Sequence, residues 1–485
     1  MLQKSNPFMR EANLIGGKWV QADSGATLDV TNPANGQKLG TVPKSGRAET
    51  RRAIEAAQAA FETFRRTTAL ERSRLLRKLA DAIMDNQQAL AELLTMEQGK
   101  SLTEAKGEIA SSAAYVMWFA EEARRTYGDV VPSPWADRRI LVTREPVGVI
   151  AAITPWNFPS SMLSRKLGPA IAAGCTAVVK PASQTPYSGL AWGALAEEVG
   201  IPAGVINIVT GSAGEIGDEM TSHPLVKKIT FTGSTEVGKL LMAKAAGTVK
   251  KVSMELGGNA PFLVFDDADL DRAVEGAMTA KYRNSGQTCV CTNRFFVQAG
   301  IHDRFVEKLA AASRTLKVGP GLEDGVQQGP LIDMKAVEKV EELVGDATAK
   351  GGKIVTGGKR HELGGTFFEP TVISDAKPQM RLMKEEIFGP VAPVFRFEKE
   401  EDAIAMANDT EFGLACYFYT SDLGRAFRVM EGLKYGMVGV NEGLITTPEA
   451  PFGGVKESGI GREGGHQGID DYLDTKYACI GGLGL

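Results

Sequence analysis

Cysteine and histidine are scarce in this chain, and long apolar runs are missing. Only five of the 485 residues are cysteine and four are histidine. A small and odd number of thiols argues against a disulfide scaffold and is typical of a reducing compartment. With so few histidines and no CxxC or HExxH motif, the sequence predicts no metal site. The most apolar stretch, residues 147–153, is far shorter than the roughly 18 to 20 residues of a membrane-spanning helix, so we expect no membrane segment.

An excess of one charge is also missing. The 55 basic and 59 acidic residues give a net charge of −4, so no overall positive field attracts the chain to nucleic acid or to an anionic membrane. Any anionic ligand must therefore be bound locally. The first twenty residues lack a cationic segment followed by an apolar core and a cleavage site, so we expect no secretory signal and a cytoplasmic location.

Glycine, in contrast, is in excess. The chain contains 55 glycines, about 11% against a usual level near 7%, which predicts many tight turns and close backbone contacts. Hydrophobic residues make up 43% and charged residues 24%, a mix typical of globular proteins with large cores. The length favours about three domains.

Helical and strand patterns divide the chain into blocks. Residues 48–125 are amphipathic and rich in Ala, Leu, Glu and Arg, which predicts two or three long helices. Residues 129–142 contain two prolines and an alternating edge, which is typical of a projecting hairpin. From 145 to 256, and again after 260, short apolar strands alternate with helical stretches, which predicts βαβ units and parallel sheets. The final segment, 471–485, is too short to fold alone and is expected to pair with the hairpin or with another subunit.

Three polar residues lie on predicted turns where they could carry chemistry. Cys289 in GQTCVCTNR follows a Gly-rich turn and precedes a strand, so it is either an accessible nucleophile or an inert half-buried thiol. A papain-like Cys and His pair is disfavoured because the four histidines are few and none lies in a motif of that kind. Glu255 in MELGGNAP is a candidate base acting through water, or a solvated turn acid. Asn157 in TPWNFP is a candidate oxyanion donor, or an ordinary cap residue.

A phosphate-binding turn is predicted at FTGSTEVGK. Here a strand, Gly233, Ser234 and a helix follow one another, so backbone N–H groups would face an anion. The GxGxxG fingerprint is absent, because Gly233 and Gly238 are five positions apart with no glycine between them. The spacing alone therefore supports a generic anion site.

Seven segments together resemble the aldehyde dehydrogenase superfamily: TPWNFP, KPASQTP, FTGSTEVGK, MELGGNAP, GQTCVCTNR, EEIFGPV and PFGGVKESGIGREGG. They occur in the order and at the separations of that family, and the resemblance runs from ANLIGGKWV to the C-terminus. Within the family, GQTCVCTNR, SRKLGPA and DYLDTKYACIGG are most similar to succinate-semialdehyde dehydrogenases. The resemblance implies an α/β fold with a Rossmann-type cofactor domain (1–125 and 144–256), an α/β catalytic domain (257–443), a small oligomerisation hairpin and tail (126–143 and 470–485) and a returning segment that lines the active site (444–469).

The resemblance also implies a mechanism. Cys289 attacks the aldehyde as a thiolate, and the Asn157 amide and the Cys289 backbone N–H bind the resulting oxyanion. Hydride passes to a nicotinamide, and a water activated by Glu255 hydrolyses the thioester. Two rivals from other classes are a thiol hydrolase, which would need no nicotinamide, and a non-catalytic scaffold protein, which would normally have lost one of these three residues.

NADP is the expected cofactor, with NAD as second choice. The resemblance assigns Trp156 and Ser234 to the pyrophosphate, Lys180 to the adenosine ribose, Leu256 to the nicotinamide pocket and Glu386 to the nicotinamide ribose. Further expected cofactor-binding residues are Ser183, Gly233 and Phe388. NAD-preferring members commonly have Glu three residues after the lysine, whereas this chain has Ser183. A hydroxyl there admits a 2′-phosphate without charge repulsion, and the alternative is that Ser183 is an ordinary turn residue.

The expected substrate is succinate semialdehyde, with glutarate semialdehyde or a broader range of aldehydes as the alternative. Arg165 and Arg283 match arginines that bind the substrate carboxylate in such relatives, and a planar guanidinium binds a carboxylate through two parallel hydrogen bonds. Without the resemblance, each would be an ordinary surface or ion-pair arginine. Thr446 stands where relatives often have a serine, and Phe158 and Phe452 are further candidates for the substrate pocket.

Three further expectations follow from the resemblance and from the spacing of the thiols. Cys291 lies two residues beyond Cys289, near enough for an oxidised pair if the loop bends, and a bystander thiol is the alternative. The resemblance implies a homotetramer built from dimers. It also implies a role in GABA degradation, with a small aldehyde as the ligand. The balanced charge and the short apolar runs predict neither nucleic acid nor membrane as a partner.

Overall fold

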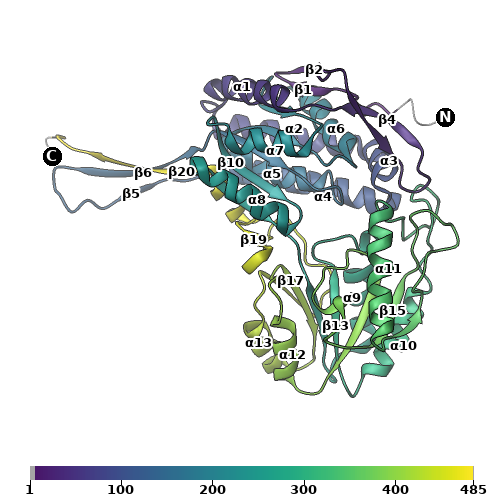
Figure 1. Ribbon diagram of the computed structural model, residues 1–485. Coiled ribbons are helices and arrows are strands. Elements are labelled where there is room, and N and C mark those ends of the chain that lie inside the picture. Colours follow the sequence, from purple (N-terminus) through teal and green to yellow (C-terminus); the bar gives the residue numbers. More distant parts are fainter. Residues whose placement is uncertain (1–5, 484–485) are drawn as a thin grey trace.

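The protein consists of two α/β bodies and a projecting arm (Figure 1). The computed structural model describes residues 6–483. Residues 1–5 of the expected cofactor domain and 484–485 of the expected tail lie outside the described residues. Helices alternate with mainly parallel strands in both bodies, which confirms the predicted α/β class. Within the described part of the chain, every helix is too short or too polar to cross a bilayer.

An eight-stranded sheet forms the first body. In spatial order its strands are β19 (Gly459–Ile460), β11 (Lys251–Glu255), β10 (Val226–Thr232), β7 (Val149–Ile153), β8 (Thr176–Lys180), β9 (Ile206–Ile208), β1 (Asn13–Ile15) and β2 (Lys18–Val20). The five strands from β11 to β9 are parallel. β7 comes first of these in the chain and has β8 on one side and β10 on the other, so the winding reverses beside β7. Ligands bind at the carboxyl ends of strands at such a switch point, which singles out the turns after β7 and β10.

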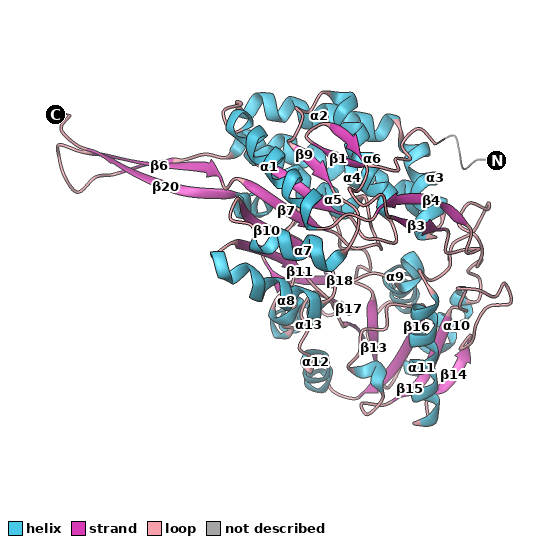
Figure 2. Ribbon diagram, turned by 45° about the horizontal axis from the view of Figure 1, so that its top comes forward, coloured by secondary structure: helices cyan, strands magenta, loops and turns pink. Residues whose placement is uncertain are grey.

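Helices cover both faces of this sheet (Figure 2). They are α1 (Arg47–Phe64), α2 (Ala69–Asp85), α3 (Gln87–Gln98), α4 (Leu102–Glu122), α5 (Ser161–Ala173), α6 (Pro186–Val199), α7 (Ala213–Ser222) and α8 (Thr235–Ala245). Side chains of the strands alternate between faces: Ala151 packs in the cluster with α1, α7 and α8, whereas Ile150 packs in the cluster with α2 to α6.

Four helices, α1 to α4, occupy the region where the composition predicts two or three, so that prediction was too low. Asn86, with ψ of 14°, breaks the run between α2 and α3. Gly99, with φ of 100°, ends α3 in the left-handed region that favours glycine. Ser101 then caps α4 by accepting a hydrogen bond from the Glu104 N–H.

A seven-stranded sheet forms the second body. In spatial order its strands are β14 (Lys353–Thr356), β15 (Thr371–Ala376), β16 (Val391–Phe397), β13 (Thr292–Gln298), β12 (Ala260–Val264), β17 (Ala415–Tyr419) and β18 (Met437–Val440). Its helices are α9 (Leu270–Tyr282), α10 (His302–Ser313), α11 (Met334–Ala349), α12 (Glu400–Asn408) and α13 (Leu423–Gly432). All seven strands fall between 257 and 443, whereas β19, in the segment that follows, pairs with β11 of the first sheet.

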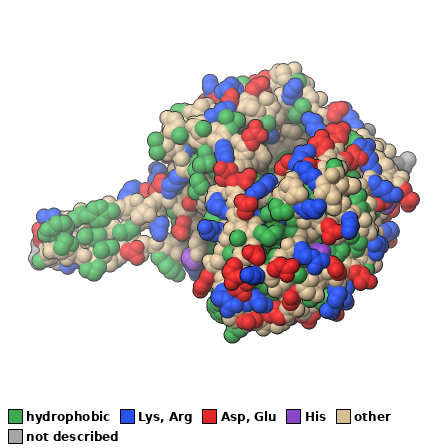
Figure 3. Space-filling model, turned by 60° about the horizontal axis from the view of Figure 1, so that its bottom comes forward, with side chains coloured by type: hydrophobic (Ala, Val, Ile, Leu, Met, Phe, Trp, Pro, Cys, Tyr) green, Lys and Arg blue, Asp and Glu red, His purple; other side chains and the backbone are tan. Residues whose placement is uncertain are grey.

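The arm is a three-stranded antiparallel sheet in the order β20 (Leu473–Ile480), β6 (Arg139–Pro146) and β5 (Asp129–Val131). The predicted hairpin is therefore confirmed, and within the chain the tail pairs with it, which was one of the two expected outcomes. β6 continues to Pro146, beyond the expected end of the hairpin at 143. Apolar side chains lie along the arm in Figure 3, among them the exposed Val130, Trp135 and Tyr477.

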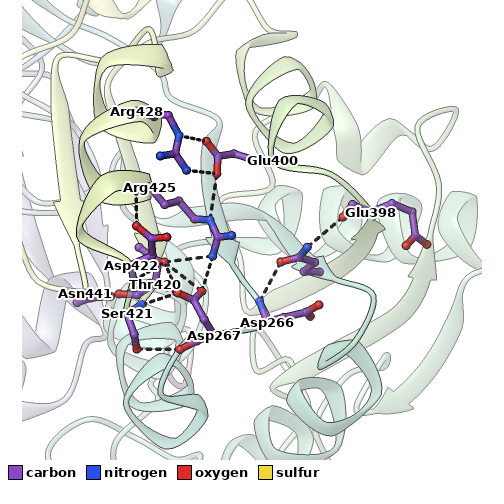
Figure 4. Close-up of polar contacts among 11 residues, drawn as sticks. Asp266, Asp267, Glu398, Glu400, Thr420, Ser421, Asp422, Arg425, Arg428 and Asn441 are labelled. Atoms are coloured by element: carbon purple, nitrogen blue, oxygen red, sulfur yellow. Dashed lines mark hydrogen bonds and ion pairs between the residues drawn. The ribbon is translucent and has the colours of Figure 1, made fainter.

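A network of charged side chains joins α12 and α13 to the second sheet (Figure 4). Asp267 accepts hydrogen bonds from Ser421 N and from the Arg425 guanidinium, the latter at 2.6 Å. Glu400 binds Arg425 and Arg428 at 3.0 and 2.8 Å. Both carboxylates are thus neutralised by arginines, so this network holds the two helices in place. The remaining short elements are β3 (Thr27–Thr31), β4 (Lys38–Pro43) and 3-10 turns such as 283–286 and 466–472.

Candidate active site

One cavity of about 300 Å³ lies between the two bodies at the switch point of the first sheet. It is lined by the turns that follow β7, β10 and β11, by the loop before β13 and by the loop before β16. Of the predicted site residues it brings together Trp156, Asn157, Gly233, Ser234, Leu256, Cys289, Glu386 and Phe388. Residues from five distant segments therefore meet where parallel sheets bind ligands.

Cys289 lies on this cavity with its side chain half-buried. Its main chain packs tightly against the turn after β11, because a Cβ at Gly258 would lie 2.3 Å from the Cys289 carbonyl oxygen. Burial, and next the Glu386 carboxylate, raise the pKa of the Cys289 thiol to about 12. The thiol is therefore protonated near neutral pH, and nucleophilic attack requires a group that accepts its proton.

Asn157, in the turn after β7, is 5% exposed and lines the same cavity. Its side-chain nitrogen donates one hydrogen bond to the Gln287 carbonyl at 3.0 Å. Its own main-chain carbonyl accepts from Lys100 Nζ at 2.8 Å and from Asn284 Nδ2 at 3.0 Å. A primary amide carries two N–H groups, so the second remains for a ligand in the cavity.

Glu255 ends β11 but is not part of the cavity lining. Its side chain lies behind the cavity wall, where a Cβ at Gly453 would come 2.8 Å from Oε1. Burial, and next the Glu463 carboxylate, raise the pKa of Glu255 well above its ordinary value. A carboxyl group with a raised pKa is suited to accept a proton near neutral pH.

Arg165, on α5, is 4% exposed. Its guanidinium lies between the rings of Tyr115 and Phe452, at 4.6 and 4.4 Å from their centroids. Nη1 is 3.8 Å from Glu463 Oε2. Neither Nε nor Nη1 makes a hydrogen bond within residues 6–483, so these two buried donors are left unused, although Arg165 itself is not part of the cavity lining.

Comparison with known proteins identifies the chain. The sequence profile of the Aldehyde dehydrogenase family matches residues 19–478. This protein belongs to that family. It is 61% identical to a glutarate-semialdehyde dehydrogenase of Pseudomonas aeruginosa over all of both chains. It is 59% identical to the NADP-dependent succinate-semialdehyde dehydrogenase of Escherichia coli over 99% of each chain. The crystal structure of a succinate-semialdehyde dehydrogenase from Burkholderia pseudomallei superposes with a TM-score of 0.98, at 59% identity over 99% of this chain and 100% of that one. The predicted aldehyde dehydrogenase fold is thereby confirmed.

The cavity of this aldehyde dehydrogenase has the groups that a nicotinamide dinucleotide needs. Ser234 caps α8 through a hydrogen bond from Val237 N at 3.4 Å, and the first N–H groups of a helix bind phosphate. The Glu386 carboxylate lines the cavity and accepts a hydrogen bond from the Gly258 N–H at 3.0 Å. The rings of Trp156 and Phe388 meet edge to face, 5.6 Å apart. The residues present therefore fit a dinucleotide.

Two predicted cofactor residues of the dehydrogenase lie beside the cavity and not in its lining. Lys180 ends β8 opposite Ile153 of β7, and its Nζ donates to the Pro181 carbonyl at 3.0 Å. Burial lowers the pKa of Lys180 to about 8. Ser183 is exposed. Lys180 thus stands at the carboxyl end of β8 and Ser183 just beyond it, and β8 is the neighbour of β7, whose following turn carries Trp156.

Another predicted substrate residue of the dehydrogenase, Arg283, lies beside the Phe158 ring. The Arg283 guanidinium lies 5.0 Å from the centroid of this ring, and Lys100 Nζ lies 3.8 Å from it. Arg283 and Thr446 are both half-buried. The Thr446 hydroxyl makes no hydrogen bond to any described residue, so it is available to a ligand.

Cys291 is buried, and its Sγ lies 3.4 Å from the Lys281 carbonyl oxygen. It therefore faces away from solvent, and its pairing with Cys289 on oxidation stays a prediction. In the part of the dehydrogenase that the structure describes, no three His, Cys, Asp or Glu side chains gather closely enough to hold a metal ion.

Lys100 and Asn284 are site residues that the sequence motifs did not reveal. Lys100 follows α3, far from the cavity in the chain, and no local pattern connects it to Asn157. Asn284 had a usable signal, since Asn-Ser-Gly is typical of a left-handed turn, and Asn284, Ser285 and Gly286 have φ of 52°, 58° and 75°. Left-handed backbone costs roughly 1 to 2 kcal/mol for each non-glycine residue, which points to a requirement of the site.

Proposed function

We propose that this aldehyde dehydrogenase oxidises succinate semialdehyde to succinate, with NADP preferred over NAD. The observation that carries the proposal is the cavity in which a cysteine thiol, an amide N–H and the groups of a dinucleotide site meet. The E. coli and B. pseudomallei relatives, named for this substrate, are each 59% identical to the chain.

The reaction proceeds through the Cys289 sulfur. The thiol gives its proton to solvent water, and sulfur attacks the aldehyde carbon to form a thiohemiacetal whose oxyanion binds the Asn157 amide and the Cys289 N–H. The bound dinucleotide supplies the hydride acceptor. Loss of hydride leaves a thioester, and a water that gives its proton to Glu255 hydrolyses it to the carboxylic acid and the free thiol.

In this proposal the nicotinamide and the pyrophosphate are held by six residues of the cavity: Trp156, Gly233, Ser234, Leu256, Glu386 and Phe388. Lys180 and Ser183 bind the adenosine ribose. Because the exposed Ser183 adds no anion beside Lys180, a 2′-phosphate is accepted there. The E. coli relative is named for NADP, which supports this choice.

Arg165 and Arg283 select an aldehyde that carries a second, anionic end. The support is the buried Arg165 guanidinium with donors available and the Arg283 guanidinium on the Phe158 ring. Phe158, Phe452 and Thr446 complete this subsite. Glutarate semialdehyde is the second candidate, because the P. aeruginosa relative named for it is 61% identical to this chain.

Replacing Arg283 by Ala is expected to raise KM for succinate semialdehyde roughly 10- to 100-fold. The reason is that a charged hydrogen bond contributes about 1.5 to 3 kcal/mol. Butanal lacks the carboxylate, so its KM should change by less than about twofold. Steady-state kinetics with both aldehydes measure the difference.

The matched control is Arg65→Ala. It removes a guanidinium that lies 5.2 Å from the Phe61 ring on the surface of α1, and it should leave both KM values unchanged. Equal losses for succinate semialdehyde and butanal in Arg283→Ala would rule out the carboxylate-binding role.

We further propose the division into a cofactor domain (1–125 and 144–256), a catalytic domain (257–443), a hairpin and tail (126–143 and 470–485) and a returning segment (444–469). The apolar arm supports an assembly of dimers into a tetramer, since exposed apolar surface favours subunit contact. A cytoplasmic location and a role in GABA degradation complete the proposal.

A further inference from the structure

Three amide-containing residues form a closed ring of hydrogen bonds behind the cavity. Asn284 Nδ2 donates to the carbonyl oxygens of Asn157 and Gln287, at 3.0 and 3.2 Å. Asn157 Nδ2 donates to the same Gln287 carbonyl at 3.0 Å. The ring therefore ties both the main chain and the side chain of Asn157 to a residue only two positions before Cys289.

The geometry points to Asn284 as a positioning residue that sets the distance between the Asn157 amide and the Cys289 thiol. This inference rests on the proposed function, because the amide and the thiol act together only if an aldehyde is attacked here. Asn284 is 1% exposed, and its side-chain nitrogen and oxygen are both bound to other protein groups, so it acts through Asn157 and not on the aldehyde or the dinucleotide.

The orientation of the Asn284 side chain is determined by its partners. Two carbonyl oxygens face one end of the side-chain amide, so that end is the nitrogen. Each of its two hydrogens is donated to one of these carbonyls. The other end, Oδ1, accepts from the buried Gln98 Nε2 at 3.1 Å. The Asn284 N–H donates to Glu104 Oε1 at 2.7 Å. Every polar group of the Asn284 side chain is thus hydrogen-bonded, so the side chain is held in one orientation.

The backbone at this position explains the choice of residue. Asn284 and Ser285 both have left-handed φ, of 52° and 58°, which asparagine tolerates better than most residues with a side chain. Glycine would tolerate the backbone equally well but has no side-chain amide to bridge the two carbonyls. Asparagine is therefore the residue that satisfies both the conformation and the bridge.

An oxyanion donor acts strongly only within a narrow range of distance, and a displacement of about 1 Å costs on the order of 100-fold in rate. Asn284→Gly keeps the backbone and removes the bridge. We expect kcat/KM for succinate semialdehyde to fall roughly 10- to 100-fold. The dissociation constant of NADP and the rate of Cys289 alkylation by iodoacetamide should change less than about threefold, since the oxyanion donor takes no part in either.

A double-mutant cycle with Asn157→Ala tests whether Asn284 acts through Asn157. If it does, adding Asn284→Gly to Asn157→Ala lowers kcat/KM by no more than about a further twofold.

Ser285→Gly is the matched control, because Ser285 shares the left-handed backbone but donates to Gly329 O, at 2.9 Å. This variant should retain kcat/KM within about threefold. If the glycine variant does not fold, the cycle is run with Asn284→Asp, which keeps the shape and removes both donors.

Losses that multiply in the double variant would overturn the inference, as would an Asn284→Gly enzyme with unchanged kcat/KM. In both of these results the wild-type enzyme still reduces NADP, so the proposed function stands. A wild-type protein that reduces neither NADP nor NAD with any aldehyde would overturn the proposed function and this inference together.

Discussion

Cys289→Ala is expected to lose aldehyde oxidation by a factor of at least about 10⁴, because Cys289 is the only thiol among the described residues that line the cavity, and without it the thioester cannot form. NADP should bind as tightly as before, because the alanine leaves the walls of the cavity intact. Steady-state NADPH formation measures the first effect, and fluorescence titration with NADP measures the second.

Cys291→Ala is the matched control for this variant. Cys291 lies two residues further on and is buried against the Lys281 carbonyl, so its loss should leave most of the activity. If Cys289→Ala kept more than about one per cent of the wild-type rate, the covalent mechanism proposed here would be wrong.

Glu255→Gln is expected to slow turnover roughly 100- to 1,000-fold by removing the base that activates water. Formation of the thioester should suffer much less, so mixing enzyme, NADP and aldehyde should give a burst of NADPH close to one equivalent of active sites, followed by a slow steady state. Stopped-flow absorbance separates the two phases.

The pH dependence of the wild-type enzyme follows from the same carboxylate. Burial raises the pKa of Glu255 well above its ordinary value, and a base works only when deprotonated. Deacylation should therefore accelerate as pH rises through this raised pKa, and the dependence should vanish in Glu255→Gln. A variant that showed no burst and kept the pH profile would exclude Glu255 as the base for water.

Much of the fold could be predicted because local patterns determine it. The short apolar strands bounded by glycine turns predicted β7 to β11 and the parallel sheet, since alternation with helices leaves few other arrangements. Pairing between distant segments could not be predicted. β1 joins the same sheet through Leu14 and Ile208, and β19 joins it through Met254 and Ile460, and nothing in either local sequence specifies such partners.

In the candidate site, too, single residues could be predicted from local motifs, but contacts between distant segments could not. Cys289, Glu255 and Asn157 stand in segments with a recognisable chemical pattern, so each could be singled out. The sequence could not show that Glu255 would lie behind the cavity wall against Gly453, nor that Lys100 and Asn284 would hold the Asn157 carbonyl. These contacts depend on how the two bodies pack, which is a property of the whole chain.

The most direct test of the central claim is a steady-state comparison of NADP and NAD with the wild-type enzyme, using succinate semialdehyde, glutarate semialdehyde and butanal. We expect kcat/KM to be at least about tenfold higher with NADP than with NAD, a difference of about 1.4 kcal/mol. Succinate semialdehyde should be the best substrate and butanal the worst. A clear preference for NAD, or equal use of butanal and the semialdehydes, would contradict the account.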